Sequence, residues 1–347
     1  MFSHISNITP VNFKSAWRSP SNIAFVKYWG KKGHQLPANP SLSMTLRECV
    51  TETTVNFSPA EKLAVELRLE GKREDRFALK IKNYLEGLSS EMPWIQGINL
   101  KIDTRNTFPH GAGIASSASG LSALALSLTD YIHHMIGENQ NELFFQRASY
   151  LSRLASGSAC RSVYGGFTTW GEANIPNASD LYATPFEVHP ELAHLQDTIL
   201  VISDAEKSVS SRAGHERMNE HGYAAARFIE AQKNFLDTVS AMKAGDFDRV
   251  GLILENEALQ LHAMMLTSPH SFTLLRPNTL AAIELIRIFR NETKLPLYFT
   301  LDAGPNLHLI YPPEHKAKIL TFIDNELNPL CQNIIYDQRG EGPLPCR

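Results

Sequence analysis

Apolar residues in the first 195 positions mostly follow the short runs and strict alternation that are typical of β-strands. Strands are predicted at Asn22–Tyr28, Val50–Phe57, Leu63–Leu69 and Ile98–Asp103. Val50–Phe57 and Leu63–Leu69 are predicted to form a hairpin or meander. Helical spacing occurs at Phe77–Leu88 and Asn141–Ala155. Residues 1–20 are mostly polar, and we expect them to form a loosely held lead-in.

The second part of the chain has a different pattern, which is dominated by long helices. A buried-type strand at Thr198–Ser203 is followed by helical spacing through Gly214–Met242, Phe247–Met265 and Asn278–Arg290. Two more predicted strands, Leu297–Thr300 and Leu307–Tyr311, flank an Asp-Ala-Gly-Pro-Asn turn. We therefore predict an α+β fold in which residues 1–195 form one domain and residues 196–347 form a second.

The composition is that of a soluble globular protein, and it excludes several classes. A net charge of −3 over 347 residues gives no global basic field for nucleic acid. The cysteines and histidines lack the spacing of zinc sites, so a structural zinc ion is not expected. No stretch approaches the roughly 18 apolar residues of a membrane span, and the N-terminal segment lacks the apolar region of a secretory signal. We expect a reduced, cytoplasmic protein.

The stretch Pro109–Gly120 (PHGAGIASSASG) gathers glycine, alanine and serine directly before a helical pattern. The apolar positions that share one face of this helix are Leu121, Leu124, Ala125, Leu128 and Ile132. Ser116 and Ser117 are suitable N-cap residues. Because free backbone N–H groups and the positive end of a helix dipole bind phosphate, this stretch is predicted to be a phosphate-binding loop.

Two common phosphate-loop patterns do not fit this stretch. A Walker A loop requires GxxxxGK[ST], but neither Gly30–Lys31 nor Gly71–Lys72 is followed by serine or threonine. A dinucleotide-binding loop requires GxGxxG or GxGxxA, and the sequence that starts at Gly111 has Ser116 in the last position. Asp130 lies near the distance expected for a ribose-binding acid, but it falls inside a helical pattern.

Four other clusters place charged or hydroxyl side chains beside small residues or turns. They are Lys27–Lys31, Ser156–Ser162, Lys207–Arg212 and the turn that contains Asp302. Taken singly, each has an ordinary structural explanation: solvated lysines, a salt bridge of Arg161, serines that cap the next helix, and an aspartate in a turn. Only their combination distinguishes a functional site from these alternatives.

Pro109–Ser119 resembles the phosphate loop of the GHMP kinase superfamily, PxxxG[LI][AG]SSA[SA]. Five other segments resemble, in the same order, the motif set of the diphosphomevalonate decarboxylase family. They are NIAFVKYWGK at 22–31, NPSLSMTL at 39–46, SGSACRSVYGG at 156–166, SSRAG at 210–214 and DAGPN at 302–306. Pro40 and His110–Gly111 depart from the common pattern. The resemblance implies a two-layer α/β sandwich of the GHMP kinase fold. Its N-terminal domain would be similar to ribosomal protein S5 domain 2, its C-terminal domain would be ferredoxin-like, and the active site would lie between them.

The same resemblance implies roles for individual residues. Asp302 would face the 3-hydroxyl group of the substrate, Lys27 would lie near Asp302 and the transferring phosphate, and Arg161 would hold the C1 carboxylate. The implied substrate-binding residues are Tyr28, Lys31, Ser156, Ser158, Ser211 and Arg212. The implied ATP-binding residues are Pro109, Gly111, Ala112, Gly113, Ile114, Ala115, Ser116, Ser117 and Ser119. Ser117 or Ser119 would contact Mg²⁺.

The reaction implied by the resemblance is ATP-dependent decarboxylation of 5-diphosphomevalonate to isopentenyl diphosphate, with ADP, phosphate and CO2 as the other products. ATP is the implied co-substrate, Mg²⁺ the implied metal and a homodimer the implied assembly. Three alternatives stay open: a relative that only phosphorylates the 3-hydroxyl, one that decarboxylates the monophosphate, and a binding module without catalysis. The presence of both Asp302 and Lys27 argues against the first, and the complete set of Lys27, Arg161 and Asp302 argues against the last.

Overall fold

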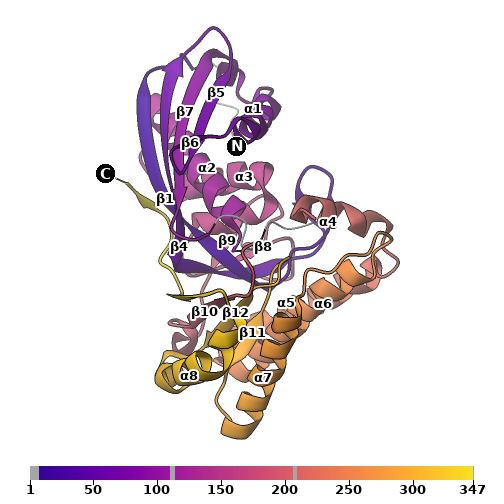
Figure 1. Cartoon of the computed structure of the whole chain (residues 1–347). Coiled ribbons are helices and arrows are strands. Elements are labelled where there is room, and N and C mark those ends of the chain that lie inside the picture. Colours follow the sequence, from indigo (N-terminus) through magenta and orange to yellow (C-terminus); the bar gives the residue numbers. More distant parts are fainter. Residues whose placement is uncertain (1–7, 110–113, 206–208, 347) are drawn as a thin grey trace.

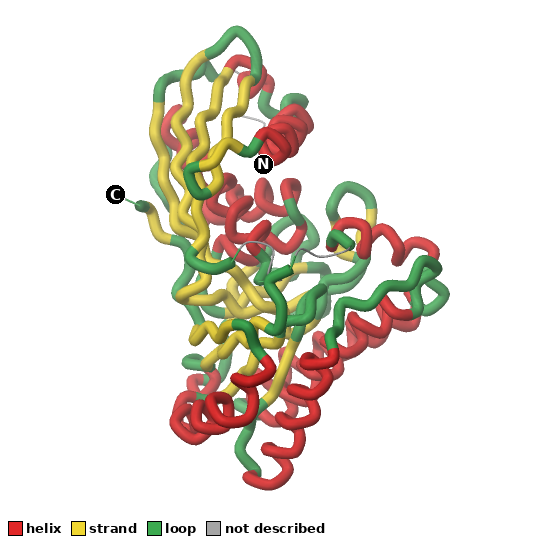
Figure 2. The backbone as a smooth tube through the Cα atoms, in the orientation of Figure 1, coloured by secondary structure: helices red, strands yellow, loops and turns green. Residues whose placement is uncertain are grey.

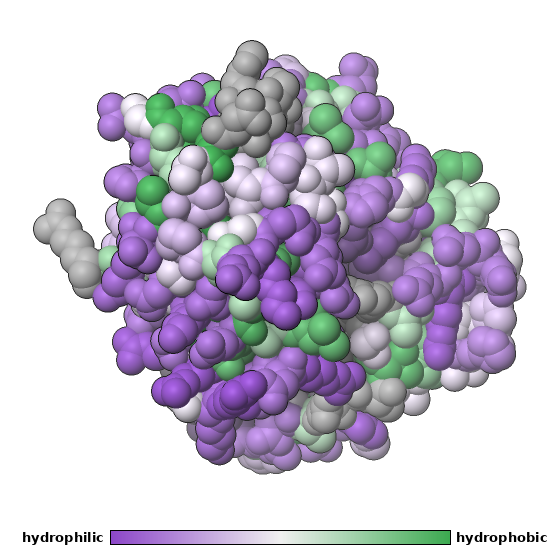
Figure 3. All heavy atoms as spheres, turned by 90° about the horizontal axis from the view of Figure 1, so that it is seen from above, coloured by the Kyte–Doolittle hydropathy of each residue, from purple (hydrophilic) through white to green (hydrophobic). Residues whose placement is uncertain are grey.

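The computed structural model describes residues 8–109, 114–205 and 209–346, which form two sheets with helices packed against them (Figure 1). The α+β class predicted from the sequence is confirmed. The predicted boundary between residues 195 and 196 falls at the first strand of the second sheet, and it stays a prediction. Among these residues, no helix is long and apolar enough to cross a bilayer, and the face seen from above is mainly hydrophilic (Figure 3).

The larger sheet is built on two long antiparallel strands, β1 (Phe13–Val26) and β4 (Ser41–Pro59). Next to β4 follow β7 (Ile98–Asn106), β5 (Ala64–Leu69) and β6 (Lys72–Arg73). The remaining strands are β14 (Leu344–Pro345) beside β1, β8 (Phe167–Trp170) beside β4, and β9 (Thr184–Phe186) beside β8.

Three helices cover one face of this sheet: α1 (Asp75–Leu88), α2 (Ser116–Ile136) and α3 (Glu142–Ala155) (Figure 1). Buried Leu85, Leu128 and Leu151 from these helices belong to one core with Val55 and Ile102 of the strands. Each such side chain contributes about 1.5–3 kcal/mol by leaving water. This packing holds α2, which begins at Ser116, against the sheet.

Two predictions about this sheet are wrong. Residues 13–20 are not a loose lead-in but the first half of β1, where Trp17 is buried. The strand at 64–69 does not form a hairpin with β4, because β7 lies between them and pairs parallel with β5. Parallel neighbours need a crossover connection, and α1 supplies it. Alternation of apolar residues identifies a strand but does not identify its partner.

The second sheet is antiparallel, with the strand order β11 (Tyr298–Thr300), β12 (Leu307–Tyr311), β10 (Gln196–Val201) and β13 (Asn333–Gln338). The helices of this part are α5 (Ala224–Ala244), α6 (Phe247–Leu266), α7 (Pro277–Thr293) and α8 (Lys316–Phe322). Phe25 and Met44 of the first sheet share a core with Ile199 and Ile310 of the second. The two sheets are therefore joined by buried apolar contacts.

The helix predicted over 214–242 is interrupted. A short helix, α4 (Ser211–Arg217), passes into a 3₁₀ turn at Met218–Glu220, and α5 starts at Ala224. The Ser210 hydroxyl caps α4 by accepting the Ala213 N–H, as the capping interpretation of these serines predicted. The break leaves α4 as a separate element, which packs against Trp29 and Gly30.

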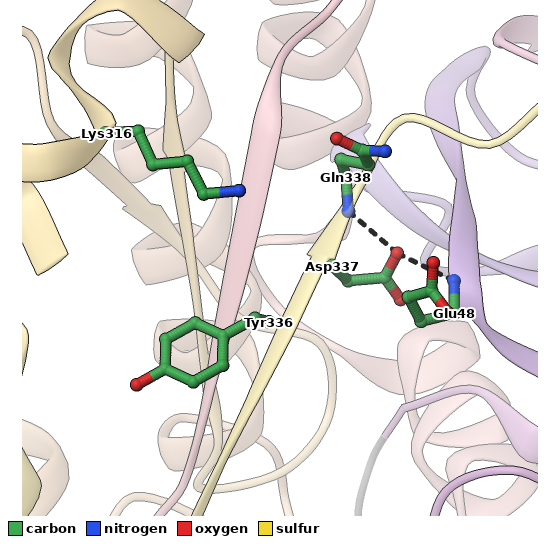
Figure 4. Close-up of a pocket in the computed structure, with 5 residues that line it drawn as sticks. All are labelled: Glu48, Lys316, Tyr336, Asp337 and Gln338. Atoms are coloured by element: carbon green, nitrogen blue, oxygen red, sulfur yellow. Dashed lines mark hydrogen bonds between the residues drawn. The ribbon is translucent and has the colours of Figure 1, made fainter.

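The chain beyond residue 311, which no motif covers, completes both sheets through β13 and β14. Asp337 of β13 also links the sheets: its carboxylate accepts the backbone N–H groups of Arg47, Glu48 and Cys49 on β4 at 2.8–2.9 Å. Figure 4 shows Asp337 directed at Glu48 in a small surface hollow. Three charge-assisted hydrogen bonds therefore join the two sheets at this point.

Candidate active site

Lys27 and Asp302 are brought together from opposite parts of the chain. Lys27 directly follows β1, and Asp302 lies in the turn between β11 and β12. The Lys27 Nζ atom donates to Asp302 Oδ1 at 2.9 Å and to the Ala24 carbonyl at 2.7 Å. The Lys27 side chain is 1% exposed and that of Asp302 is 28% exposed. The amine is therefore covered by protein, while the acid stays open to a ligand.

This contact decides the ionisation of Asp302. Burial alone would raise the pKa of Asp302, but the attraction and hydrogen bond of Lys27 outweigh it, and the net effect is a lowered pKa. For Lys27, burial is the largest cause and lowers its pKa, and the charges of Asp302 and Glu257 oppose it. The pair is a carboxylate that can accept a proton beside a cation that can neutralise developing negative charge.

Arg161 is a second buried cation, and its surroundings are different. It lies in the 3₁₀ segment Gly157–Val163 and donates to Asn22 Oδ1 and Ser41 Oγ, both neutral acceptors. Among the residues that the structure describes, no carboxylate forms an ion pair with it, so the salt-bridge alternative for Arg161 is not supported. Burial lowers the pKa of Arg161. A buried guanidinium without an acid partner favours an anionic ligand.

Tyr28 lies between Arg161's segment and α4. Its hydroxyl is buried and has no hydrogen-bond partner in the described part of the chain. A Cβ atom on Gly157 would come within 2.7 Å of this hydroxyl, so only glycine fits there. Ser156 and Ser158 flank Gly157 and are half-buried. Tyr28 therefore lies against the backbone segment that carries two of the other predicted substrate-binding residues.

α4 docks on the segment that follows Tyr28. His215 Nδ1 accepts the Gly30 N–H at 3.0 Å, and a Cβ atom on Gly214 would lie 2.5 Å from the Trp29 ring. Burial lowers the pKa of His215 to about 3, with the charge of Lys31 contributing, so this histidine is neutral. Lys31 begins β2 (Lys31–Lys32), which pairs with β3 (Leu36–Pro37). The docking brings the first turn of α4, with Ser211 and Arg212, to this segment.

Parts of the predicted site lie outside the described residues. These parts are Gly111–Gly113, Lys207 and the side chains of Ser211 and Arg212. Figure 2 shows that the loops gather between the helices of the first sheet and the long helices of the second, at the level of α4. The described site residues come from loops or element ends of both sheets.

The start of α2 has an unusual cap. The helix begins at Ser116, and its N-cap is Ala115, with φ +48° and no side-chain cap. The prediction that Ser116 and Ser117 cap the helix is therefore wrong, because both are already helical. Among the described residues, no side chain caps this turn. The Ala118 N–H donates to the Ala115 carbonyl at 2.8 Å, so the first-turn N–H groups that an anion could bind are those of Ser116 and Ser117. Ile114 is buried beside this turn, and Pro109 is exposed at the start of the loop.

Family models match both halves of the chain. Residues 19–183 match the diphosphomevalonate decarboxylase-like N-terminal domain, and residues 197–341 match the mevalonate 5-diphosphate decarboxylase C-terminal domain. Diphosphomevalonate decarboxylase of Ganoderma lucidum is 32% identical over 332 residues, which cover 90% of this chain and 81% of that protein. The chain belongs to the diphosphomevalonate decarboxylase family.

Solved structures of the diphosphomevalonate decarboxylase family have the same fold. Mevalonate diphosphate decarboxylase from Enterococcus faecalis superposes with a TM-score of 0.82 at 30% identity, covering 97% of this chain and 100% of that one. A complex of MDDEF with MVAPP, AMPPCP and magnesium gives a TM-score of 0.83 at 31% identity, with coverages of 97% and 100%. The GHMP kinase fold expected from the sequence is confirmed.

The two serines predicted to contact Mg²⁺ differ in their surroundings. The Ser119 hydroxyl is buried and hydrogen-bonded to Thr51 Oγ1 at 2.6 Å and to the Ser116 carbonyl at 3.2 Å, whereas Ser117 is exposed. Within residues 8–109, 114–205 and 209–346, no three His, Cys, Asp or Glu side chains form a metal site. A magnesium ion held mainly by phosphate oxygens and water needs few protein ligands, so Ser117 fits this role better than Ser119.

Sequence reasoning missed the side chains that hold the backbone of the site residues. Glu257 and His262 of α6 contact the main chain of Lys27 and Asp302, respectively. Glu257 lies three residues after Leu254 and four before Leu261, on the buried face of the helix. An acidic residue at an apolar helical position was the signal that could have identified it.

Proposed function

We propose that this protein converts 5-diphosphomevalonate and ATP into isopentenyl diphosphate, ADP, phosphate and CO2. The observation that carries this proposal is the 2.9 Å contact between Lys27 and the partly exposed carboxylate of Asp302. Membership of the diphosphomevalonate decarboxylase family supports it, because the site retains an acid and two buried cations. ATP and Mg²⁺ are supported by the AMPPCP and magnesium in the complex of a similar structure.

In the first step, Asp302 accepts the proton of the substrate's 3-hydroxyl group while O3 attacks the γ-phosphorus of ATP and the bond to ADP breaks. Lys27 keeps Asp302 ionised before the transfer and offsets the negative charge around the phosphoryl group. The transfer converts the hydroxyl group, which is a poor leaving group, into a phosphate ester, from which phosphate leaves readily.

In the second step, the C3–O bond breaks and phosphate leaves with its electron pair, so positive charge develops at C3. The electrons of the C1–C2 bond then form the C2–C3 double bond, and C1 leaves as CO2. Arg161 holds the C1 carboxylate by two parallel hydrogen bonds until that bond breaks.

Other residues of the site bind the rest of 5-diphosphomevalonate and the phosphates of ATP. Tyr28, Lys31, Ser156, Ser158, Ser211 and Arg212 bind the diphosphate and the body of 5-diphosphomevalonate. The loop 109–119 binds the ATP phosphates through backbone N–H groups at the uncapped start of α2. Mg²⁺, with Ser117 as a protein contact, neutralises phosphate charge when it is bound.

The test is to incubate the purified protein with ATP, Mg²⁺ and either 5-diphosphomevalonate or 5-phosphomevalonate, and to assay ADP, phosphate and CO2. We expect equal amounts of the three products with the diphosphate and little turnover of the monophosphate. ADP without CO2 would identify a kinase, and turnover of the monophosphate alone would identify the other decarboxylase. No product from either substrate would favour a binding module.

We also propose that the protein is a homodimer in the cytoplasm, as the family resemblance implies. Light scattering coupled to size-exclusion chromatography measures the mass directly. A mass near twice the 38.7 kDa of one chain is expected, and a mass of one chain would contradict the dimer.

A further inference from the structure

The backbone of Lys27 lies just beyond a sheet ladder. The pairing of β1 with β4 ends at Val26 and Leu42. Side chains take the place of a neighbouring strand: the Lys27 N–H donates to Glu257 Oε2 at 2.8 Å, and its carbonyl accepts from Asn39 Nδ2 at 3.0 Å. The main chain of Lys27 is therefore held on both sides by side-chain groups.

Glu257 is itself held rigidly. Its side chain is fully buried, and Arg227 of α5 binds both of its oxygens, at 2.9 and 2.6 Å. Asn234 donates to Glu257 Oε1 at 2.7 Å. With the Lys27 N–H, each carboxylate oxygen accepts two hydrogen bonds. Because Arg227 binds both oxygens and each oxygen accepts two hydrogen bonds, the carboxylate is held in one orientation.

Helix α6, which carries Glu257, also holds the backbone of Asp302. His262, five residues after Glu257 on α6, donates from Nε2 to the Asp302 carbonyl at 3.1 Å. α6 therefore contacts the main chain of both Lys27 and Asp302. The distance between the ammonium and the carboxylate depends on one rigid element rather than on two independent loops.

We propose that Glu257 is a positioning residue for the decarboxylation reaction, which fixes the Lys27 main chain so that the ammonium group meets Asp302. This inference rests on the proposed function. Glu257 touches neither substrate, and it acts through Lys27. A displacement of about 1 Å at such a group lowers the rate by up to about 100-fold, with little effect on substrate binding.

Glu257 also affects the charge of Lys27. The titratable and charged groups that act on Lys27 are Asp302 in its turn, Glu257 on α6, Asp197 on β10 and Arg161 in its 3₁₀ segment, with Arg227 of α5 behind Glu257. Burial lowers the pKa of Lys27, and Asp302 and Glu257 oppose this. Replacing Glu257 by a neutral residue lowers that pKa further. Because the reaction needs the protonated amine, the alkaline limb of activity then moves to lower pH.

The experiment compares Glu257→Gln with Glu255→Gln. Glu255 lies on the same helix, is also buried and pairs with Arg290, but it contacts the Phe299 N–H rather than Lys27. We expect Glu257→Gln to lower kcat about 10- to 100-fold, to leave KM for both substrates within about twofold, and to shift the alkaline limb of kcat to lower pH. Glu255→Gln is expected to lose stability while its kcat and pH profile stay close to wild type.

Equal kcat values and pH profiles in the two variants would overturn the inference. If Glu257→Gln does not fold, Arg227→Lys takes its place, because it weakens the support of Glu257 but keeps the charge. An Arg227→Lys variant with wild-type kcat would then overturn the inference. Lack of turnover by the wild-type protein would instead contradict the proposed function.

Discussion

The two buried cations of the site lie in contrasting surroundings. In the Lys27 region, which comprises Lys27 and Asp302, each polar group of Lys27 has a protein partner. Its ammonium pairs with Asp302, its backbone N–H donates to Glu257, and its carbonyl accepts from Asn39. Within the described part of the chain, the Arg161 guanidinium donates to the neutral oxygens of Asn22 and Ser41 and pairs with no carboxylate, and the nearby Tyr28 hydroxyl has no partner.

This difference in surroundings indicates two different roles for the two cations. A cation that is already paired with an acid tunes that acid and responds to charge that develops during the reaction. A buried cation without an acid partner, beside an unsatisfied hydroxyl, is complementary to an anion that arrives from outside. We therefore propose that the phosphoryl-transfer chemistry takes place at Lys27 and Asp302 and that Arg161 binds the substrate carboxylate.

The largest effect is expected from Asp302→Asn. The amide cannot accept the proton of the 3-hydroxyl group, and Lys27 loses its charged partner, so kcat falls by about 10³- to 10⁴-fold. Affinity for ATP, measured by equilibrium binding of a non-hydrolysable analogue, stays near wild type. A rate close to wild type would remove Asp302 from the mechanism.

A smaller effect is expected from Arg161→Lys. Lysine keeps the charge but cannot form two parallel hydrogen bonds to a carboxylate, so kcat/KM for 5-diphosphomevalonate falls about 100-fold while KM for ATP is unchanged. Arg153→Lys is the control, because Arg153 is also buried but donates to the carbonyls of Leu181 and His34. It is expected to lower the melting temperature rather than kcat/KM; equal kinetic losses in both variants would contradict the assignment of Arg161.

Tyr28→Phe tests the role of the hydroxyl that has no partner in the described structure. If this hydroxyl is reserved for the substrate, its removal lowers kcat/KM about tenfold, the value of one lost hydrogen bond to a charged group. The free energy of unfolding, measured in urea, does not decrease, because no protein hydrogen bond is lost within the described structure. A loss of stability without a kinetic change would show that the hydroxyl is structural.

The smallest effects distinguish the two serines of the phosphate loop. Ser119→Ala removes a buried hydrogen bond to Thr51 and is expected to cost about 1 kcal/mol of unfolding free energy, with little change in the Mg²⁺ dependence of activity. Ser117→Ala is expected to raise the Mg²⁺ concentration for half-maximal rate severalfold, without loss of stability. The opposite result would assign the metal contact to Ser119.

Much of the candidate site was predictable because its residues lie in short, ordered motifs. The start of α2 and the turn between β11 and β12 have the positions that the sequence pattern predicts. The contact of Lys27 with Asp302, expected only from the family resemblance, is present in the structure. The roles of these residues in catalysis stay predictions.

Other features depend on contacts between segments far apart in the sequence. Alternation could not show that β7 separates β4 from β5, or that residues 13–20 extend β1. Serine propensity predicted a cap where Ala115, with a positive φ, occupies that position. Glu257 was missed because its partners lie 30 and 230 residues away, in Arg227 and Lys27.

The most direct test of the division between the two regions is the affinity for 5-diphosphomevalonate without ATP, measured by calorimetry for wild type, Asp302→Asn and Arg161→Lys. We expect the Kd of Asp302→Asn to stay within about fivefold of wild type, and that of Arg161→Lys to rise by about 30- to 100-fold, or roughly 2–3 kcal/mol. A large loss of affinity in Asp302→Asn, with Arg161→Lys near wild type, would contradict the assignment of chemistry to one region and binding to the other.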